Sequence, residues 1–203
     1  MDFMLDGGIR LIVLVQDLGW LDAPMRFFTF LGSENFFLLV LPAVYWCIDS
    51  ALGLRVGLIL LFSSGLNEVI KMTLRGPRPY WYSTRVKALT AETSFGVPSG
   101  HAQIATGVWG VLAARLGTRL AGIAAGAIIL LIGFSRIYLA VHFPHDVLFG
   151  WLLGGLTLGA FLYFQSPAEQ WVARQSFAKQ AGLSFLISAG CVLLGGFLFS
   201  GLR

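Results

Sequence analysis

The stretch SRIYLAVHFPHD, residues 135–146, holds two histidines, an arginine and an aspartate in a chain that is otherwise mostly apolar. The whole chain has three histidines, and the remaining one lies in PSGH, residues 98–101. A third polar stretch, KMTLRGPRP at 71–79, contributes the basic residues Lys71 and Arg78. Imidazole, carboxylate and guanidinium groups together suit nucleophilic or acid–base chemistry on an anionic substrate.

The 135–146 stretch contains a predicted helix start, which sets the geometry of its polar residues. Pro144 disfavours helical backbone at the residue before it and fits the first turn of a helix. His142 then lies just ahead of the helix, and Asp146 in the first turn can reach back to it. A carboxylate bonded to one ring nitrogen fixes the tautomer and leaves the other nitrogen free. The pattern predicts a positioned neutral imidazole, able to act as nucleophile or general base.

The PSGH stretch predicts a second helix start with an anion site. Ser99 is a good N-cap residue, and Gly100 lets backbone N–H groups approach a ligand closely. Helix N-termini bind anions through free N–H groups and the helix dipole. Lys71, Arg78 and Arg136 add positive charge, and arginine forks match phosphate oxygens. The residues therefore predict a phosphate cradle that contains His101 and His142.

Other polar residues nearby have simpler explanations. Glu68 precedes Lys71 by about one helical turn and is expected to pair with it. His145 points away from His142 and Asp146 on the helix, and no catalytic role is expected for it. The aromatic run 80–82 is typical of a membrane interface. Three further basic residues are expected to reach lipid headgroups: Arg75, Arg85 and Lys87.

The composition indicates a membrane protein. The 203 residues are 57% hydrophobic and 12% charged, with a mean hydropathy of +0.78, whereas a soluble domain carries about 25% charged residues. An all-α bundle of six transmembrane helices is predicted, because each apolar segment is about long enough to cross a bilayer. The predicted spans are 34–49, 52–73, 99–116, 118–139, 144–164 and 181–202.

The order of the spans brings the polar stretches together. Consecutive spans alternate in direction, so all three polar stretches lie on one side of the membrane. Residues 1–33 carry a charge in every apolar run and are expected to form an interfacial amphipathic segment. Residues 34–203 then form the helical domain. The basic residues divide nine to five in favour of the histidine side, and this count does not decide the orientation, because several of the nine would bind ligand.

Cysteine usage and net charge add little that is specific. Cys47 and Cys191 lie inside apolar runs and are expected to be buried small hydrophobes. The formal net charge of +4 comes from residues that flank membrane segments, where anionic lipid headgroups are the expected partner and nucleic acid is not. The oligomeric state cannot be read from these features.

The three polar stretches resemble the signature of the type 2 phosphatidic acid phosphatase (PAP2) superfamily, K-x6-RP, PSGH and SR-x5-H-x3-D, at every position. The resemblance implies a six-helix core over about residues 34–202. It implies that His142 is the nucleophile, oriented by Asp146, and that His101 is the general acid. It implies that no metal or cofactor is needed. The phosphate oxygens would be held by Lys71, Arg78, Ser99, Gly100 and Arg136.

The membrane setting and the resemblance together favour a lipid-phosphate phosphatase with its site on the extracytoplasmic face. The candidate substrates are a polyprenyl pyrophosphate, phosphatidylglycerophosphate, phosphatidic acid and a sphingoid-base phosphate. A vanadate-dependent haloperoxidase could use the same cradle, but those relatives are soluble. A non-catalytic lipid-phosphate binder or transporter is the third alternative, although binding alone would need only the cations.

Overall fold

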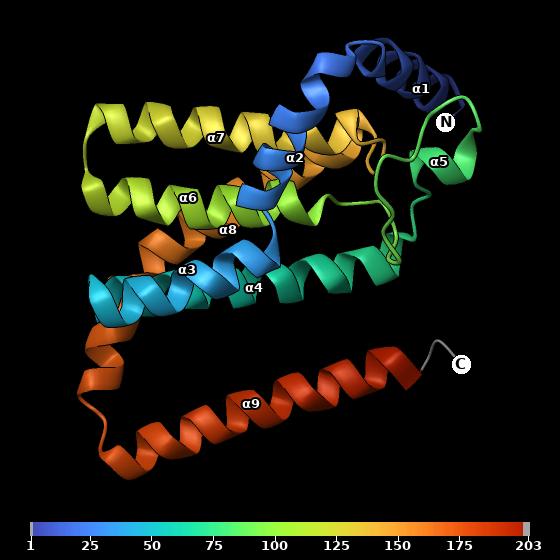
Figure 1. Ribbon diagram of the computed structural model, residues 1–203. Coiled ribbons are helices and arrows are strands. Elements are labelled where there is room, and N and C mark those ends of the chain that lie inside the picture. The colour runs from blue at the N-terminus through green and yellow to red at the C-terminus, as the bar shows by residue number, and fades with distance from the viewer. Residues whose placement is uncertain (1, 201–203) are drawn as a thin grey trace. The chain divides into compact units, whose positions relative to one another are not determined.

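All regular elements that the computed structural model describes are helices. It describes residues 2–200, except for the side chains of residues 2, 3, 191 and 194–200. The all-α prediction is confirmed for this part of the chain (Figure 1). The elements are α1 (Asp2–Gln16), the short 3-10 helix η1 (Gly19–Leu21), α2 (Asp22–Leu31), α3 (Glu34–Cys47), α4 (Ser50–Leu74), α5 (Pro79–Tyr82), α6 (Gly100–Leu116), α7 (Arg119–Tyr138), α8 (Pro144–Ala173) and α9 (Phe177–Ser200).

The helices form two compact units. Residues 1–159 form the first, which contains α1 to α7 and the first half of α8. Residues 160–203 form the second, which contains the remainder of α8 and α9. Every residue of the three polar stretches belongs to the first unit.

Three helical segments among the described residues are long and apolar enough to cross a membrane. They are Ser50–Tyr82, Arg119–Tyr138 and Pro144–Ala173. A fourth is obtained if Gly19–Leu31 and Glu34–Cys47, which meet at a bend of 52°, count as one broken span. The protein is therefore an integral membrane protein. All six predicted spans coincide with helices over their described residues, but the number of crossings stays a prediction.

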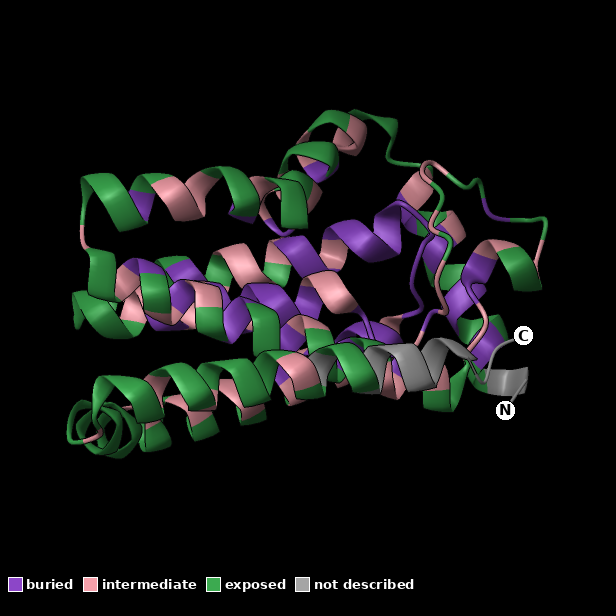
Figure 2. Ribbon diagram, turned by 90° about the horizontal axis from the view of Figure 1, so that it is seen from below, coloured by how far each residue is buried: buried purple, intermediate pink, exposed green. Residues whose placement is uncertain are grey.

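The outer faces of these helices suit a lipid environment. Figure 2 shows buried residues on the inner sides of the first unit and exposed residues on the outer sides. Many of the exposed residues are large and apolar, such as Leu61 and Phe62 on α4 and Leu120 and Ile123 on α7. Exposed apolar surface on this scale is unusual for a soluble monomer and is expected where lipid tails cover the protein.

The predicted N-cap at Ser99 is confirmed, and side chains cap two further helix starts. The Ser99 hydroxyl accepts a hydrogen bond from Ala102 N at the start of α6, and the Thr118 hydroxyl accepts one from Ala121 N at the start of α7. The side chain of Asp49 accepts two backbone hydrogen bonds at the start of α4. These bonds satisfy N–H groups that a helix start leaves free.

Two glycines of α8 bring its backbone against α6. A Cβ atom at Gly150 would lie 2.6 Å from the Ser99 carbonyl oxygen, and one at Gly154 would lie 2.7 Å from the Gln103 carbonyl oxygen. At Gly155 and Gly159 a Cβ would meet nothing within 4 Å. Two of these four glycines therefore allow close packing, and the contact holds together the starts of the two helices that carry His101 and Asp146.

The N-terminal segment packs on the bundle with its apolar face. Leu5, Ile9 and Ile12 of α1 share a buried cluster with Phe143 and Val147. A Cβ at Gly8 would lie 2.7 Å from the Phe143 ring, so α1 lies closely over the turn that carries His142. This apolar face contacts protein, and an amphipathic segment at the membrane interface stays a prediction.

Two sequence expectations are wrong. Cys47 is exposed at the end of α3, because α3 ends there and its outer face is uncovered by protein; the Cys191 side chain lies outside the described part of the structure. The helix starting at Pro144 does not end near residue 164 but continues to Ala173, with Pro167 inside it. Pro167 removes one helical hydrogen bond without ending the helix.

Candidate active site

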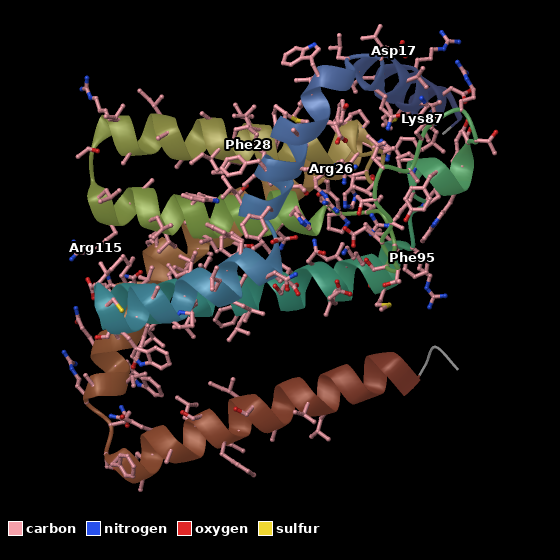
Figure 3. The ribbon with its side chains drawn as sticks, viewed as in Figure 1. Asp17, Arg26, Phe28, Lys87, Phe95 and Arg115 are labelled. Atoms are coloured by element: carbon pink, nitrogen blue, oxygen red, sulfur yellow. The ribbon has the colours of Figure 1, made fainter. Side chains whose placement is uncertain are left out.

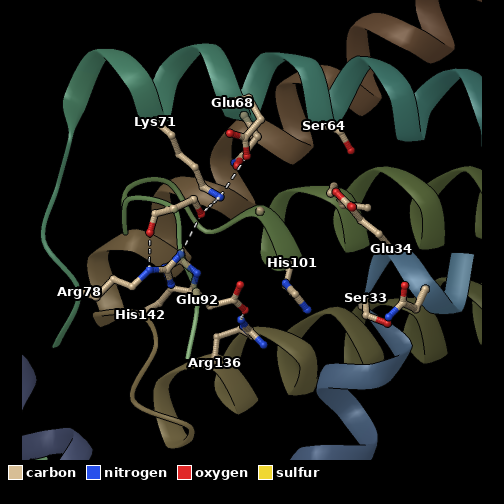
Figure 4. Close-up of a pocket in the computed structure, with 16 residues that line it drawn as sticks. Ser33, Glu34, Ser64, Glu68, Lys71, Arg78, Glu92, His101, Arg136 and His142 are labelled. Atoms are coloured by element: carbon tan, nitrogen blue, oxygen red, sulfur yellow. Dashed lines mark hydrogen bonds and ion pairs between the residues drawn. The ribbon is translucent and has the colours of Figure 1, made fainter. Parts of the chain in front are cut away.

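The three polar stretches line one pocket of about 320 Å³ in the first unit, which we call the histidine pocket (Figure 4). The α2–α3 junction, α4, the α5–α6 loop, the start of α6, the end of α7 and the turn before α8 all contribute to it. Its lining residues are Gly32, Ser33, Glu34, Asn35, Ser64, Asn67, Glu68, Lys71, Arg78, Glu92, Ser94, Gly100, His101, Ile104, Arg136 and His142.

His142 is fixed by the turn between α7 and α8. Ala140 adopts a left-handed backbone with φ of 59°, and His142 N donates to the Arg136 carbonyl over 3.3 Å. The imidazole is 2% exposed, and its Nδ1 lies 3.4 Å from Asp146 Oδ2. The same carboxylate oxygen accepts a 2.8 Å hydrogen bond from Phe143 N, which fixes its position. This arrangement leaves Nε2 as the ring nitrogen available for chemistry.

Burial keeps His142 neutral. Removal from water disfavours the imidazolium form and lowers the pKa of His142 to about 4, although the Asp146 carboxylate acts in the opposite direction. A neutral imidazole has a free lone pair at physiological pH, as nucleophilic attack requires.

His101 lies in the first turn of α6 and points into the same pocket (Figure 4). Gly32, at the α2–α3 junction, borders the His101 ring, since a Cβ there would lie 3.5 Å from it, an ordinary van der Waals distance. The two histidines thus come from separate helix starts and share one cavity, as the sequence predicted.

Lys71 and Arg136 bring positive charge to the pocket and already have acidic neighbours. Lys71 Nζ lies 3.4 Å from Glu68 Oε1 and 3.2 Å from Ser94 Oγ. Arg136, at 3% exposure, donates one terminal nitrogen to the Glu92 carboxylate and the other to Thr29 Oγ1. The expected pairing of Glu68 with Lys71 is present.

Arg78 lines the pocket, but most of its N–H groups donate hydrogen bonds to backbone oxygens. Its Nε donates to the Ser94 carbonyl over 2.7 Å, and its terminal nitrogens donate to the carbonyls of Phe95 and Val141. A further bond joins it to Ser94 Oγ. Four of the five guanidinium N–H donors are thereby engaged. Arg78 connects the α5–α6 loop to the turn before His142, and one N–H is left for a ligand.

Ser99 and Asp146 stand behind the pocket, whereas Gly100 lines it. Ser99 N donates to the Asp146 carbonyl over 3.0 Å, which couples the starts of α6 and α8. A Cβ at Gly100 would lie 3.1 Å from Asn67 Oδ1 and 3.7 Å from Lys71 Nζ, so only glycine leaves this side of the cavity open. Of the predicted phosphate-binding residues, Ser99 is therefore the one outside the lining.

The sequence analysis missed a buried amide network and two loop residues. Asn67 Nδ2 donates to Gln103 Oε1 over 2.8 Å, and Gln103 Nε2 donates to the Ser63 carbonyl over 3.1 Å. This network holds α4 against α6 beneath the pocket. Polar side chains within apolar runs were its only sequence signal. Glu92 and Ser94 gave no signal, because their partners are distant in the chain.

His145 lies outside the pocket lining but contacts Asp146, and the absence of a catalytic role for it stays a prediction. Its Nε2 lies 3.1 Å from Asp146 Oδ1, and its ring stacks on Phe143 at 5.3 Å. The basic residues assigned to lipid headgroups, Arg75, Arg85 and Lys87, also lie outside the lining. No group of three or more potential metal ligands occurs among the described residues, and metal independence stays a prediction.

Comparison with known proteins identifies the family. Residues 52–170 match the sequence profile of the PAP2 superfamily. This chain belongs to the PAP2 superfamily. Phosphatidylglycerophosphatase B of Bacillus subtilis is 34% identical over 71% of this chain and 73% of its own. Glucose-6-phosphatase 3 of Bos taurus is 32% identical over 95% of this chain and 62% of its own. The chain thus spans about three fifths of the length of the glucose-6-phosphatase relatives.

Solved structures of PAP2 proteins have a similar fold. The transmembrane PAP2-type phosphatidylglycerolphosphate phosphatase from Bacillus subtilis aligns with a TM-score of 0.66 and 29% identity, over 78% of this chain and 86% of that one. LpxE of Aquifex aeolicus aligns with a TM-score of 0.68 and 25% identity, over 76% of this chain and 93% of that one.

Proposed function

We propose that this protein is a membrane phosphatase of the PAP2 type that hydrolyses the phosphate ester of a membrane lipid through a phosphohistidine intermediate. One observation carries the proposal. His142, held by Asp146, and His101 line one pocket together with Lys71 and Arg136. A nucleophile, a proton donor and anion-binding cations are the parts that phosphoryl transfer requires.

The reaction proceeds in two steps. In the first, His142 Nε2 attacks phosphorus, the bond to the ester oxygen breaks, and His101 gives its proton to the departing oxygen. In the second, a water oxygen attacks phosphorus while His101 accepts its proton. The phosphorus–nitrogen bond then breaks and releases inorganic phosphate. Lys71, Arg136 and the remaining N–H of Arg78 stabilise the charge on the equatorial oxygens.

A lipid phosphomonoester with a polar headgroup is the leading substrate. The relatives include a phosphatidylglycerophosphatase, and exposed apolar helix faces could receive lipid tails. Glu34, Asn35 and Ser64 line the pocket and can accept hydrogen bonds from hydroxyl groups. Figure 4 shows Glu34 and Ser64 on the side away from Lys71 and Arg78. The same polar side favours a sugar phosphate as the second candidate, in keeping with the glucose-6-phosphatase relatives. Polyprenyl pyrophosphate and phosphatidic acid lack a hydroxylated leaving group of this kind, and a sphingoid-base phosphate offers one hydroxyl beside an amine.

The proposal includes a six-span topology with the pocket on the extracytoplasmic side. Helices α3, α4, α6, α7, α8 and α9 correspond to the six predicted spans. Helix α6 has 17 residues, about 26 Å at 1.5 Å per residue, and is the shortest but one of the six.

A substrate panel tests the proposal. Purified protein in detergent is assayed for phosphate release from phosphatidylglycerophosphate, phosphatidic acid, a sphingoid-base phosphate, a polyprenyl pyrophosphate and glucose 6-phosphate, with His142→Ala as the blank. We expect release from phosphatidylglycerophosphate and inhibition by orthovanadate, which can mimic the pentacoordinate phosphorus. Absence of hydrolysis across the panel would revive the non-catalytic binder, and halide oxidation with vanadate would favour the haloperoxidase.

A further inference from the structure

The α5–α6 loop holds a carboxylate directly on a cation of the histidine pocket. Glu92 lies in this loop, and its backbone is clamped by the Tyr80 hydroxyl. That hydroxyl donates to Glu92 O and accepts from Glu92 N, each over 3.0 Å. With its backbone fixed in this way, Glu92 reaches the Arg136 guanidinium, and Figure 4 shows the pair inside the pocket.

The contact engages a deeply buried cation of the pocket. The Arg136 side chain is 3% exposed and that of Glu92 is 33% exposed. Thr29 of α2 takes the other terminal nitrogen of Arg136, and the buried Nε has no hydrogen-bond partner. A carboxylate and a phosphate present similar oxygen acceptors to a guanidinium fork. Glu92 therefore occupies a donor that an incoming phosphate would use.

Glu92 carries its negative charge at neutral pH. Burial favours the neutral carboxyl, but the positive charge of Arg136 and its hydrogen bond outweigh burial and lower the pKa of Glu92. In the empty pocket this charge offsets a buried guanidinium that would otherwise be costly. Once a phosphate dianion is bound, the same charge repels it.

We propose that Glu92 is a resident anion that competes with phosphate for Arg136, so that it weakens phosphate binding and speeds product release. The inference rests on the proposed function for its link to product release. Glu92 takes no part in bond making. It acts through Arg136. It stabilises the pocket when no phosphate is bound, and it speeds the release of phosphate after turnover.

The direction in which phosphate affinity changes in a Glu92 variant separates this role from a purely structural one. Glu92→Gln keeps the side-chain length and an oxygen acceptor for Arg136 and removes the charge. If Glu92 competes with phosphate, the variant binds phosphate more tightly. If Glu92 only holds Arg136 in place, the variant loses an ion pair, Arg136 loosens, and phosphate binds more weakly.

The experiment measures the Kd of inorganic phosphate by calorimetry on the whole protein in detergent, in a His142→Gln background that cannot turn over. We expect Glu92→Gln to lower this Kd about tenfold, since a like charge nearby is removed. Asp22→Asn is the matched control, because it removes the same charge from an exposed ion pair with Arg26 on α2. An unchanged or raised Kd in Glu92→Gln overturns the proposal.

Steady-state kinetics of Glu92→Gln in a protein that keeps His142 give an independent test. Glu92→Gln is expected to lower both KM and kcat, because the substrate phosphate binds more tightly and the product leaves more slowly. A rise in KM would also overturn the proposal. Failure of the proposed function is distinguishable, since it shows as absence of hydrolysis in the substrate panel while the phosphate Kd can still be compared. Melting temperatures of each variant check that the fold is intact.

Discussion

At the residue scale, the site divides its work between two histidines that differ in support. His142 Nδ1 lies 3.4 Å from the Asp146 carboxylate, whereas no polar contact of this kind to another described residue holds the His101 ring. A buried nucleophile needs a fixed orientation, and a proton donor needs to follow the departing oxygen. This difference leads to a test that separates their roles.

Loss of His101 is expected to matter only when the leaving oxygen needs a proton. His101→Ala should lower kcat for an alkyl phosphate by about 10²–10⁴-fold, the usual value of general acid catalysis. With p-nitrophenyl phosphate, whose leaving group departs without protonation, the loss should be much smaller. His142→Ala should be inactive on both substrates. Equal losses for His101→Ala on the two substrates would contradict its role as the acid.

Burial of neutral His142 also makes stability depend on pH. The folded pKa of about 4 lies below the unfolded value of about 6.5, so the unfolded state binds more protons between these values. Stability from this residue is complete above pH 6.5 and falls as the pH is lowered, by about 2 kcal/mol at pH 5. Denaturant unfolding of wild type and His142→Gln at pH 7 and pH 5 measures it. The difference between the two proteins should shift in favour of His142→Gln at pH 5.

At the element scale, the parts that depend on local sequence were predictable and the parts that depend on distant contacts were not. Pro144 and Ser99 correctly marked the starts of α8 and α6, because capping and proline geometry act within one helical turn. The donors of Arg78 go to Ser94, Phe95 and Val141. Its motif position indicated a phosphate ligand, but these partners come from two separate loops that only the folded chain brings together.

The close approach of α8 to α6 is the element-scale feature on which the site most depends. Gly150→Ala would place a methyl group 2.6 Å from the Ser99 carbonyl oxygen, push the helices apart and strain the Ser99–Asp146 hydrogen bond. We expect a loss of about 1–3 kcal/mol of stability, typical of overpacking, together with reduced kcat. Thermal unfolding in detergent and phosphate release measure the two effects.

Gly155→Ala is the matched control on the same helix. A Cβ there meets nothing within 4 Å, and alanine favours helix more than glycine does. We expect this variant to keep its activity and to be as stable as the wild type or slightly more so. If both alanine variants behaved alike, the α6–α8 contact would not be what holds the starts of the helices that carry His101 and Asp146 together.

At the scale of the whole molecule, the histidine pocket with the α5–α6 loop and the short α6–α7 connection lie at opposite ends of the first unit. The α5–α6 loop lies at one end of α6 and the α6–α7 connection at the other (Figure 1). Figure 3 shows Lys87 and Phe95 at the loop end and Arg115 at the far end. The apolar surface between the two ends suits a bilayer, so we expect the pocket to lie near one membrane face.

Cysteine labelling in cells can show which face this is. Lys87 and Arg119 are exposed at the two ends, and Lys87→Cys and Arg119→Cys are made in a chain with Cys47→Ser and Cys191→Ser. If the pocket faces outward, a membrane-impermeant maleimide labels Lys87→Cys in intact cells and labels Arg119→Cys only after permeabilisation. The reverse pattern would place the pocket in the cytoplasm. The substrate would then have to be a phosphate ester on the inner leaflet or in the cytoplasm, which would favour the sugar-phosphate alternative over a lipid processed outside.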